Sequence, residues 1–190
     1  MIAKGSIILL VILIIVSTIT IPNFLKDSQN LEITENCDLD KLEPKEMYKK
    51  CDFSDLDLSY KNLSKTNFVQ SNFQNANLEG SNLSYAVLDG NNFDGANLEN
   101  ANLEGALLQS AIFTNANLKN SDLSNSYATS ANFSYANLEN AKLNRSHIGG
   151  SDFTNANLIN ADFTEVSLED VSGLQSVVWK DCRGFYMCMK

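Results

Sequence analysis

The residues with the clearest capacity for chemistry are four cysteines, which stand outside a long repetitive region. Cys37 and Cys51 lie at its amino-terminal end, and Cys182 and Cys188 follow it. An even number of cysteines in an exported chain predicts disulfide bonds. Four cysteines allow three connectivities. We favour Cys37–Cys51 and Cys182–Cys188, because the region between them holds the two pairs apart.

A second interpretation of the carboxy-terminal cysteines is a soft-metal site. Cys182, Met187, Cys188 and Met189 together offer thiolates and thioethers, which suit Cu(I). Because a structural disulfide accounts for the same cysteines, we expect no metal there.

The remaining reactive side chains do not form a recognisable catalytic set. His147 is the only histidine, so no second one can complete a metal triad. Asp52, Asp55 and Asp57 could attract a cation, but they lack the spacing of a calcium loop, and we interpret them as solvated carboxylates. The chain has no phosphate-binding loop, no Gly-rich dinucleotide turn and no nucleophile elbow. We therefore expect no enzyme and no cofactor.

The amino-terminal segment 1–25 differs in kind from the rest of the chain. Residues 5–25 carry no charge, and 7–16 read IILLVILIIV. A signal anchor needs roughly 20 apolar residues to span the hydrocarbon, whereas a signal peptide needs a shorter apolar stretch and a cleavage site. We expect a hydrophobic helix at 1–25, as anchor or cleaved signal. Either way, positive charge at the amino end favours export of the remainder.

The acidity of the chain belongs to the repetitive region. The formal charge is −9, and residues 51–170 hold 15 acidic and 5 basic side chains. Because binding to a phosphate backbone needs Lys and Arg, this balance excludes nucleic acid as an expected partner.

The repetitive region places a large apolar residue at every fifth position. Neither an α-helix nor a straight strand brings residues five apart to one face. They can meet only if the chain turns a corner once per five residues. A small residue two positions earlier, such as Ala156 before Leu158, points inward as well and makes room near the corner.

The true repeat is four such sides long, that is 20 positions, because every fourth large residue has the same type. One column holds Phe53, Phe73, Phe93, Phe113, Phe133 and Phe153, and another holds Leu58, Leu78, Leu98, Leu118, Leu138 and Leu158. Four sides of five residues give about six coils over 51–170, with backbone hydrogen bonds running between parallel coils. One core position holds only Ala128, which predicts a void or a local bulge.

These units resemble the pentapeptide repeat family, whose pattern is Ala, then Asp or Asn, then Leu or Phe, then two variable residues. Ala-Asn-Leu at 76–78, 96–98, 116–118, 136–138 and 156–158 carries the resemblance. It implies an all-β fold, a right-handed quadrilateral parallel β-helix, but no activity. The asparagines of these triplets form an outward column, which we interpret as a ladder of stacked amides.

Both ends of such a stack need covers against edge-to-edge aggregation. We expect 26–50 to be a linker and an amino-terminal cap, with a short helix over 43–51 that begins near Pro44. We expect 171–190 to form a carboxy-terminal cap in which Trp179 covers the last coil.

Together these features predict a non-enzymatic solenoid outside the cytoplasm, either anchored in the membrane by its amino-terminal helix or secreted. It would act as a structural scaffold or bind an unknown protein. The alternative comes from the resemblance, since some family members resemble duplex DNA and bind type II topoisomerases. An exported domain argues against that alternative.

Overall fold

The structure is a computed structural model that describes residues 37, 42–178 and 180–184. The predicted helix at 1–25 and most of the linker at 26–50 lie outside these residues. Trp179 and Cys188 lie outside them as well. Within the described ranges, no helix is long and apolar enough to cross a bilayer.

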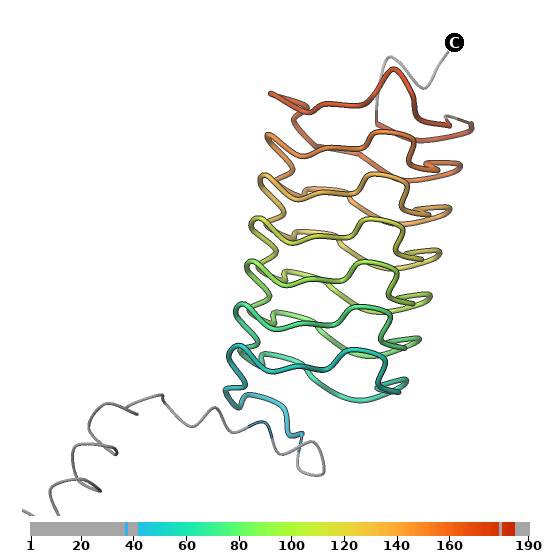
Figure 1. The fold of residues 1–190 in the computed structure, drawn as a ribbon. Coiled ribbons are helices and arrows are strands. Elements are labelled where there is room, and N and C mark those ends of the chain that lie inside the picture. The colour runs from blue at the N-terminus through green and yellow to red at the C-terminus, as the bar shows by residue number, and fades with distance from the viewer. Residues whose placement is uncertain (1–36, 38–41, 179, 185–190) are drawn as a thin grey trace, which may run out of the picture. The chain divides into compact units, whose positions relative to one another are not determined.

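Residues 42–178 and 180–184 form a parallel β-helix, as the 20-residue period predicts (Figure 1). Single residues rather than long strands pair between coils, nearly always with the residue 20 positions away. Each coil has four sides, and each side contributes one pairing residue. We number the sides by the column that each pairing residue joins: side 1 from Met47 to Ser167, side 2 from Asp52 to Ser172, side 3 from Asp57 to Val178 and side 4 from Asn62 to Arg183.

Each corner is a tight turn that recurs every five residues. In the turn at 78–81, the amide of Ser81 donates to the carbonyl of Leu78 at 3.1 Å. The residue before each new side is left-handed, with φ of 60° at Gly80 and 59° at Asn100. Gly and Asn tolerate this conformation best, which explains why they recur at these positions.

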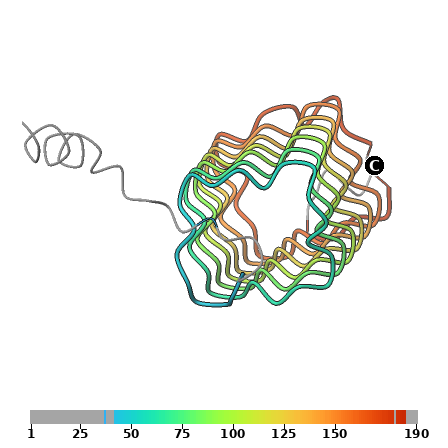
Figure 2. The same cartoon turned by 60° about the horizontal axis from the view of Figure 1, so that its bottom comes forward.

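The core lies inside the coils and consists of the predicted columns. All twelve residues of the Phe and Leu columns named above are buried. Successive phenylalanine rings stack with centroids 4.8–5.0 Å apart, from Phe53–Phe73 to Phe133–Phe153. This distance matches the spacing of paired strands, so the coils superimpose when seen from the end (Figure 2).

The predicted helix over 43–51 is wrong, because the β-helix already begins there. Met47 pairs with Asn67, and Tyr48 fills the core position below Phe68, with ring centroids 5.6 Å apart. Tyr48 precedes Phe68 by one full coil and Phe53 by one side, so it extends both periods. Burial of its ring outweighs the helical preference of the short segment.

The pairing between coils also continues beyond residue 170, where the sequence predicts only a cap. Val178 pairs with Asn157 and Arg183 with Asp162, and both pairs are separated by one position more than the pairs of the regular coils. The extra residue falls just after Ser172. There Gly173 has φ of 80° and lies so close to Thr154 that an added Cβ would meet the Thr154 nitrogen at 2.2 Å. Backbone, rather than a large side chain, therefore covers this part of the last complete coil.

The alanine at position 128 leaves the ladder in register. Its amide donates to the carbonyl of His147 at 2.8 Å, and Tyr127 pairs with Leu107 and His147 in the ordinary way. The bulge that we considered does not form. Nearby, the buried hydroxyls of Ser126 and Ser146 have no hydrogen-bond partner. The void therefore stays a prediction, since Ala128 occupies a position that Leu108 and Ile148 fill in adjacent coils.

Filling this position tests for the void. We expect Ala128→Leu to keep or raise the melting temperature, because the added side chain buries apolar surface without displacing neighbours. Thermal unfolding followed by circular dichroism measures this. Leu108→Ala is the matched control and should cost about 2–5 kcal/mol. A clear drop in melting temperature for Ala128→Leu would show that no space exists.

Candidate functional site: the outward ladders

The closed core leaves only outward residues and the two ends for contact with other molecules. The ladder residues just before each core residue point outward. Within the described residues, no group of three or more His, Cys, Asp or Glu side chains is arranged to hold a metal ion. The candidate sites are therefore distinguished by the charge, polarity and hydrogen bonding of the outward side chains in each ladder.

Side 3 carries a continuous asparagine ladder. The amide nitrogen of each asparagine donates to the side-chain oxygen one coil earlier, from Asn77 to Asp57 at 3.1 Å through Asn157 to Asn137 at 3.0 Å. The same oxygens accept backbone amides of the following turn, as Asn97 does from Glu99 at 3.2 Å. These contacts confirm the interpretation as a structural ladder.

The predicted aspartate cluster on the first coils belongs to the same kind of network. The Asp52 carboxylate accepts from the hydroxyl of Ser54 at 2.7 Å and from the side-chain amide of Asn72 at 3.0 Å. Bonds from Ser54 lower the pKa of Asp52, and bonds from Ser59 lower the pKa of Asp57 in the same way. Their oxygens are used within the fold, so the cluster resembles a set of turn caps more than a ligand site.

Ion pairs neutralise part of the acidic surface on sides 3 and 4. Lys119 contacts Glu139 at 3.1 Å, and Lys142 contacts Asp122 at 3.1 Å. Burial alone would raise the pKa of Asp122, but bonds from Ser124 and Lys142 lower it overall. Each pair joins neighbouring coils, so these charges stabilise the stack locally. The positive member of each pair also weakens the negative electrostatic potential at that part of the surface.

Side 1 differs from the other sides because the middle of its ladder is apolar and aromatic. It runs through Val87, Leu107, Tyr127 and His147. Leu107 is 37% exposed and Tyr127 is 49% exposed. The rings of Tyr127 and His147 stack in parallel planes with centroids 4.6 Å apart. Our sequence analysis missed this column, although reading every twentieth residue from position 87 would have found it.

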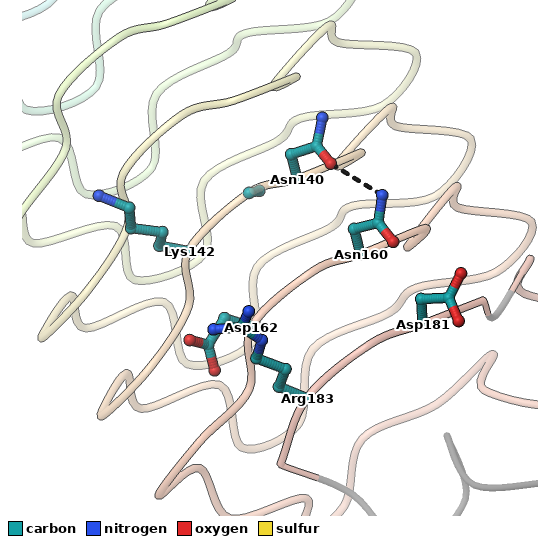
Figure 3. A pocket seen from close by; sticks show the side chains of 7 residues that line it. Asn140, Lys142, Asn160, Asp162, Asp181 and Arg183 are labelled. Atoms are coloured by element: carbon teal, nitrogen blue, oxygen red, sulfur yellow. Dashed lines mark hydrogen bonds between the residues drawn. The ribbon is translucent and has the colours of Figure 1, made fainter.

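A shallow depression of about 460 Å³ lies at the corner of sides 3 and 4, near the carboxy-terminal end (Figure 3). Asn140, Lys142, Asn160, Asp162, Asp181 and Arg183 line it. The Asn160 amide donates to Asn140 at 3.0 Å, as part of another ladder. Charges of both signs are mixed in this open hollow, which gives it no clear preference for a ligand.

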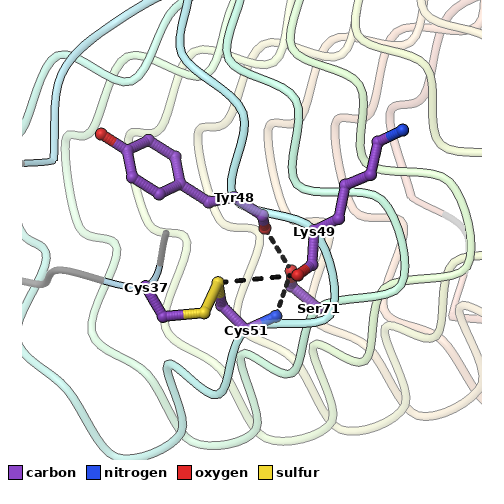
Figure 4. Close-up of a disulfide and its surroundings, with 5 residues drawn as sticks. All are labelled: Cys37, Tyr48, Lys49, Cys51 and Ser71. Atoms are coloured by element: carbon purple, nitrogen blue, oxygen red, sulfur yellow. Dashed lines mark hydrogen bonds between the residues drawn. A yellow bond between two sulfur atoms is a disulfide. The ribbon is translucent and has the colours of Figure 1, made fainter. Parts of the chain in front are cut away.

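The amino-terminal end is closed by the predicted disulfide between Cys37 and Cys51, whose Cα atoms are 5.6 Å apart (Figure 4). Cys51 is buried, and its amide donates to the Ser71 hydroxyl at 3.1 Å. The same hydroxyl donates to the Tyr48 carbonyl at 2.8 Å. The disulfide thus ties residue 37 to the first coil of the core.

Cys182 is also disulfide-bonded, which argues against the alternative copper site. Its predicted partner, Cys188, lies outside the described residues.

The pairing pattern and closed core define a parallel β-solenoid. Residues 49–84 and 71–109 match pentapeptide repeats, and residues 96–173 match a pentapeptide repeat region. The chain therefore belongs to the pentapeptide repeat family. No curated protein matches the sequence.

Similar solved structures are pentapeptide repeat proteins as well. Rfr23 from the cyanobacterium Cyanothece is 22% identical, with 70% of this chain and 90% of that chain covered and a TM-score of 0.41. The plasmid-mediated fluoroquinolone resistance protein QnrB1 is 18% identical, with 76% and 86% covered and a TM-score of 0.37. A protein of the Arabidopsis thaliana thylakoid lumen is 29% identical, with 66% and 70% covered and a TM-score of 0.26.

Acid should weaken the fold through the aspartates that cap turns. Bonds from Thr154 lower the pKa of Asp152, so its stabilising effect is complete above the unfolded pKa, about 3.9, and is lost as pH falls through the folded value. We expect the melting temperature to fall below about pH 4, and Asp152→Asn to flatten that fall. Thermal melts from pH 7 to pH 2 measure both. An equally steep fall in the variant would contradict this role of Asp152.

Removing the amino-terminal disulfide should destabilise the first coil. The bond closes a separation of 14 residues, for which the chain-entropy model gives about 3 kcal/mol. We expect the double variant Cys37→Ser, Cys51→Ser to lose about that much in urea unfolding. Serine fits the second site, since Ser71 and Ser151 occupy the same column. An unchanged unfolding midpoint would show that the first coil is held without the bond.

Proposed function

We propose that this protein is a non-enzymatic scaffold outside the cytoplasm, membrane-anchored or secreted, that binds a protein partner on the outer faces of its solenoid. The observation that carries the proposal is the oxidised state of the cysteines at both ends of the described solenoid. Cys37 and Cys51 are bonded to each other, and Cys182 is also in a disulfide. Structural disulfides persist in oxidising compartments, which fits the apolar sequence at 5–25.

The non-enzymatic part of the proposal is supported by how the polar side chains are used. The outward Asn and Asp side chains of sides 2 to 4 mainly donate to and accept from neighbouring coils and turns, as Asn77 and Asp52 do. Catalysis needs groups that converge on a substrate, whereas these groups lie in separate columns along flat faces. A flat, rigid surface of this kind suits contact with another macromolecule.

Topology is the property to test. A tag at Lys190 on intact cells should be accessible to external protease, and mass spectrometry after alkylation without reductant should find no free thiol. The same protease treatment after permeabilisation is the positive control for cleavage. A tag that is cut only after permeabilisation, together with four free thiols, would overturn the proposal.

The second candidate is an acidic mimic of DNA that binds a type II topoisomerase. Residues 51–170 hold 15 acidic and only 5 basic side chains, and this acidity favours the DNA mimic. Ion pairs between coils hold three of these acidic side chains, and the apolar ladder on side 1 has no counterpart on a phosphate backbone. The purified chain should therefore leave the supercoiling activity of such an enzyme unchanged, and inhibition would favour the mimic.

A further inference from the structure

The apolar ladder on side 1, comprising Val87, Leu107, Tyr127 and His147, needs a function of its own. The corresponding positions on sides 3 and 4 hold mostly Asn, Asp or charged residues. The fold does not require apolar residues there, because Asn77 and Asn97 pair their backbones in the same way. We refer to these four residues as the side-1 patch.

The ring geometry narrows the class of ligand. Tyr127 and His147 are parallel to within 3° and stack between adjacent coils, so each ring covers a face of the other and presents its edge outward. A sugar or a nucleobase would stack on an exposed ring face. The patch instead suits a flat apolar surface that packs against the edges, as two β-sheets do at about 10 Å.

We propose that the side-1 patch binds the same patch of a second copy of this chain, in an antiparallel dimer. The chain carries a formal charge of −9, so two copies repel each other over most of their surfaces. In the four rows 87–90, 107–110, 127–130 and 147–150, Asp89 is the only residue with a full charge at neutral pH. This part of side 1 therefore lets two acidic copies approach each other with little charge repulsion.

The rows of the patch complement each other when one copy is inverted. A two-fold axis across the rods, between the rows of Leu107 and Tyr127, places Leu107 opposite Tyr127 of the other copy. The same axis places Val87 opposite His147. Each smaller side chain then faces a larger one, as a self-complementary two-fold interface requires. Parallel copies would instead set Tyr127 against Tyr127.

Charges at the rim favour the same antiparallel arrangement. The corner residues that precede side 1 include Lys65, Tyr85, Arg145 and Glu165. The antiparallel axis pairs the row of Lys65 with that of Glu165, and the row of Tyr85 with that of Arg145. Lys65 and Glu165 have opposite charges. Glu165 is already ion-paired with Arg145 of its own chain at 2.8 Å, so Lys65 of the partner copy would approach the carboxylate of an existing pair. Parallel copies would bring Glu165 toward Glu169 of the partner copy, which repels.

The small area of the face indicates a weak interface. Seven rows about 4.8 Å apart, on a side roughly 14 Å wide, give about 400 Å² of flat area. A standard interface buries about 800 Å² on each partner. We therefore expect a weak dimer with a Kd of tens to hundreds of micromolar, which is detectable at high protein concentration.

Sedimentation velocity on the purified protein tests the dimer from about 10 μM to 1 mM. We expect the wild type to shift toward dimer over this range. The double variant Leu107→Asn, Tyr127→Asn should stay monomeric, since it places on side 1 the residue that other ladders carry. Ile112→Asn is the matched control, because it removes a 41% exposed apolar side chain from side 2 of the same coil and should leave dimerisation intact.

A charge swap tests the antiparallel register. Lys65→Glu should weaken the dimer at least threefold by opposing Glu165. Adding Arg145→Glu together with Glu165→Arg, which keeps the ion pair within the chain in reversed order, should restore it. A wild type that stays monomeric up to about 1 mM would overturn the proposal. Patch-dependent binding to lipid vesicles by such a monomer would assign the patch to another occupant. These outcomes do not depend on the compartment of the protein. The dimer can therefore be confirmed when the proposed function fails, and the proposed function can be confirmed when the dimer fails.

Discussion

The structure depends on one constraint, which is that residues 20 positions apart must lie directly above one another. Backbone amides and carbonyls of each coil pair with the next coil, as Leu78 donates to Asn97 at 2.7 Å. A shift of one residue would turn each core side chain toward solvent. The core columns, the left-handed corners and the outward ladders are all consequences of keeping this register. Stability is therefore shared between neighbouring coils, as in other repeat architectures.

The same constraint separates the residues that make the fold from those that are free to vary. Inward positions hold mostly Phe, Leu and small residues because the distance between coils is fixed, and corner positions favour Gly and Asn. An outward residue needs only to pair its backbone with the neighbouring coil, so its side chain is free to vary. Asparagine gains amide contacts there, but Val87, Leu107 and Tyr127 pair their backbones equally well. A departure from asparagine on an outward ladder thus costs the fold little, and it directs attention to contacts with other molecules.

The two ends solve the edge problem in different ways. At the start, Tyr48 covers Phe68 and a disulfide ties Cys37 to the first coil. Near the end, an extra residue after Ser172 lets the backbone at Gly173 lie close to Thr154, the residue after Phe153. Both devices protect a stack that would otherwise present open pairing edges.

The sequence by itself determined the 20-residue period and the two main core columns, because these follow from residue types at fixed spacing. It also predicted the amino-terminal disulfide, because the repetitive region separates the two pairs of cysteines. It did not reveal where the β-helix begins and ends. Segment 43–51 has a helical composition, and only the burial of Tyr48 against Phe68 assigns it to the first coil. The one-residue insertion after Ser172 hides the last pairings from a periodic reading. The 20-residue period already places the four residues of the side-1 patch in one column, but they become a surface only when the coils stack.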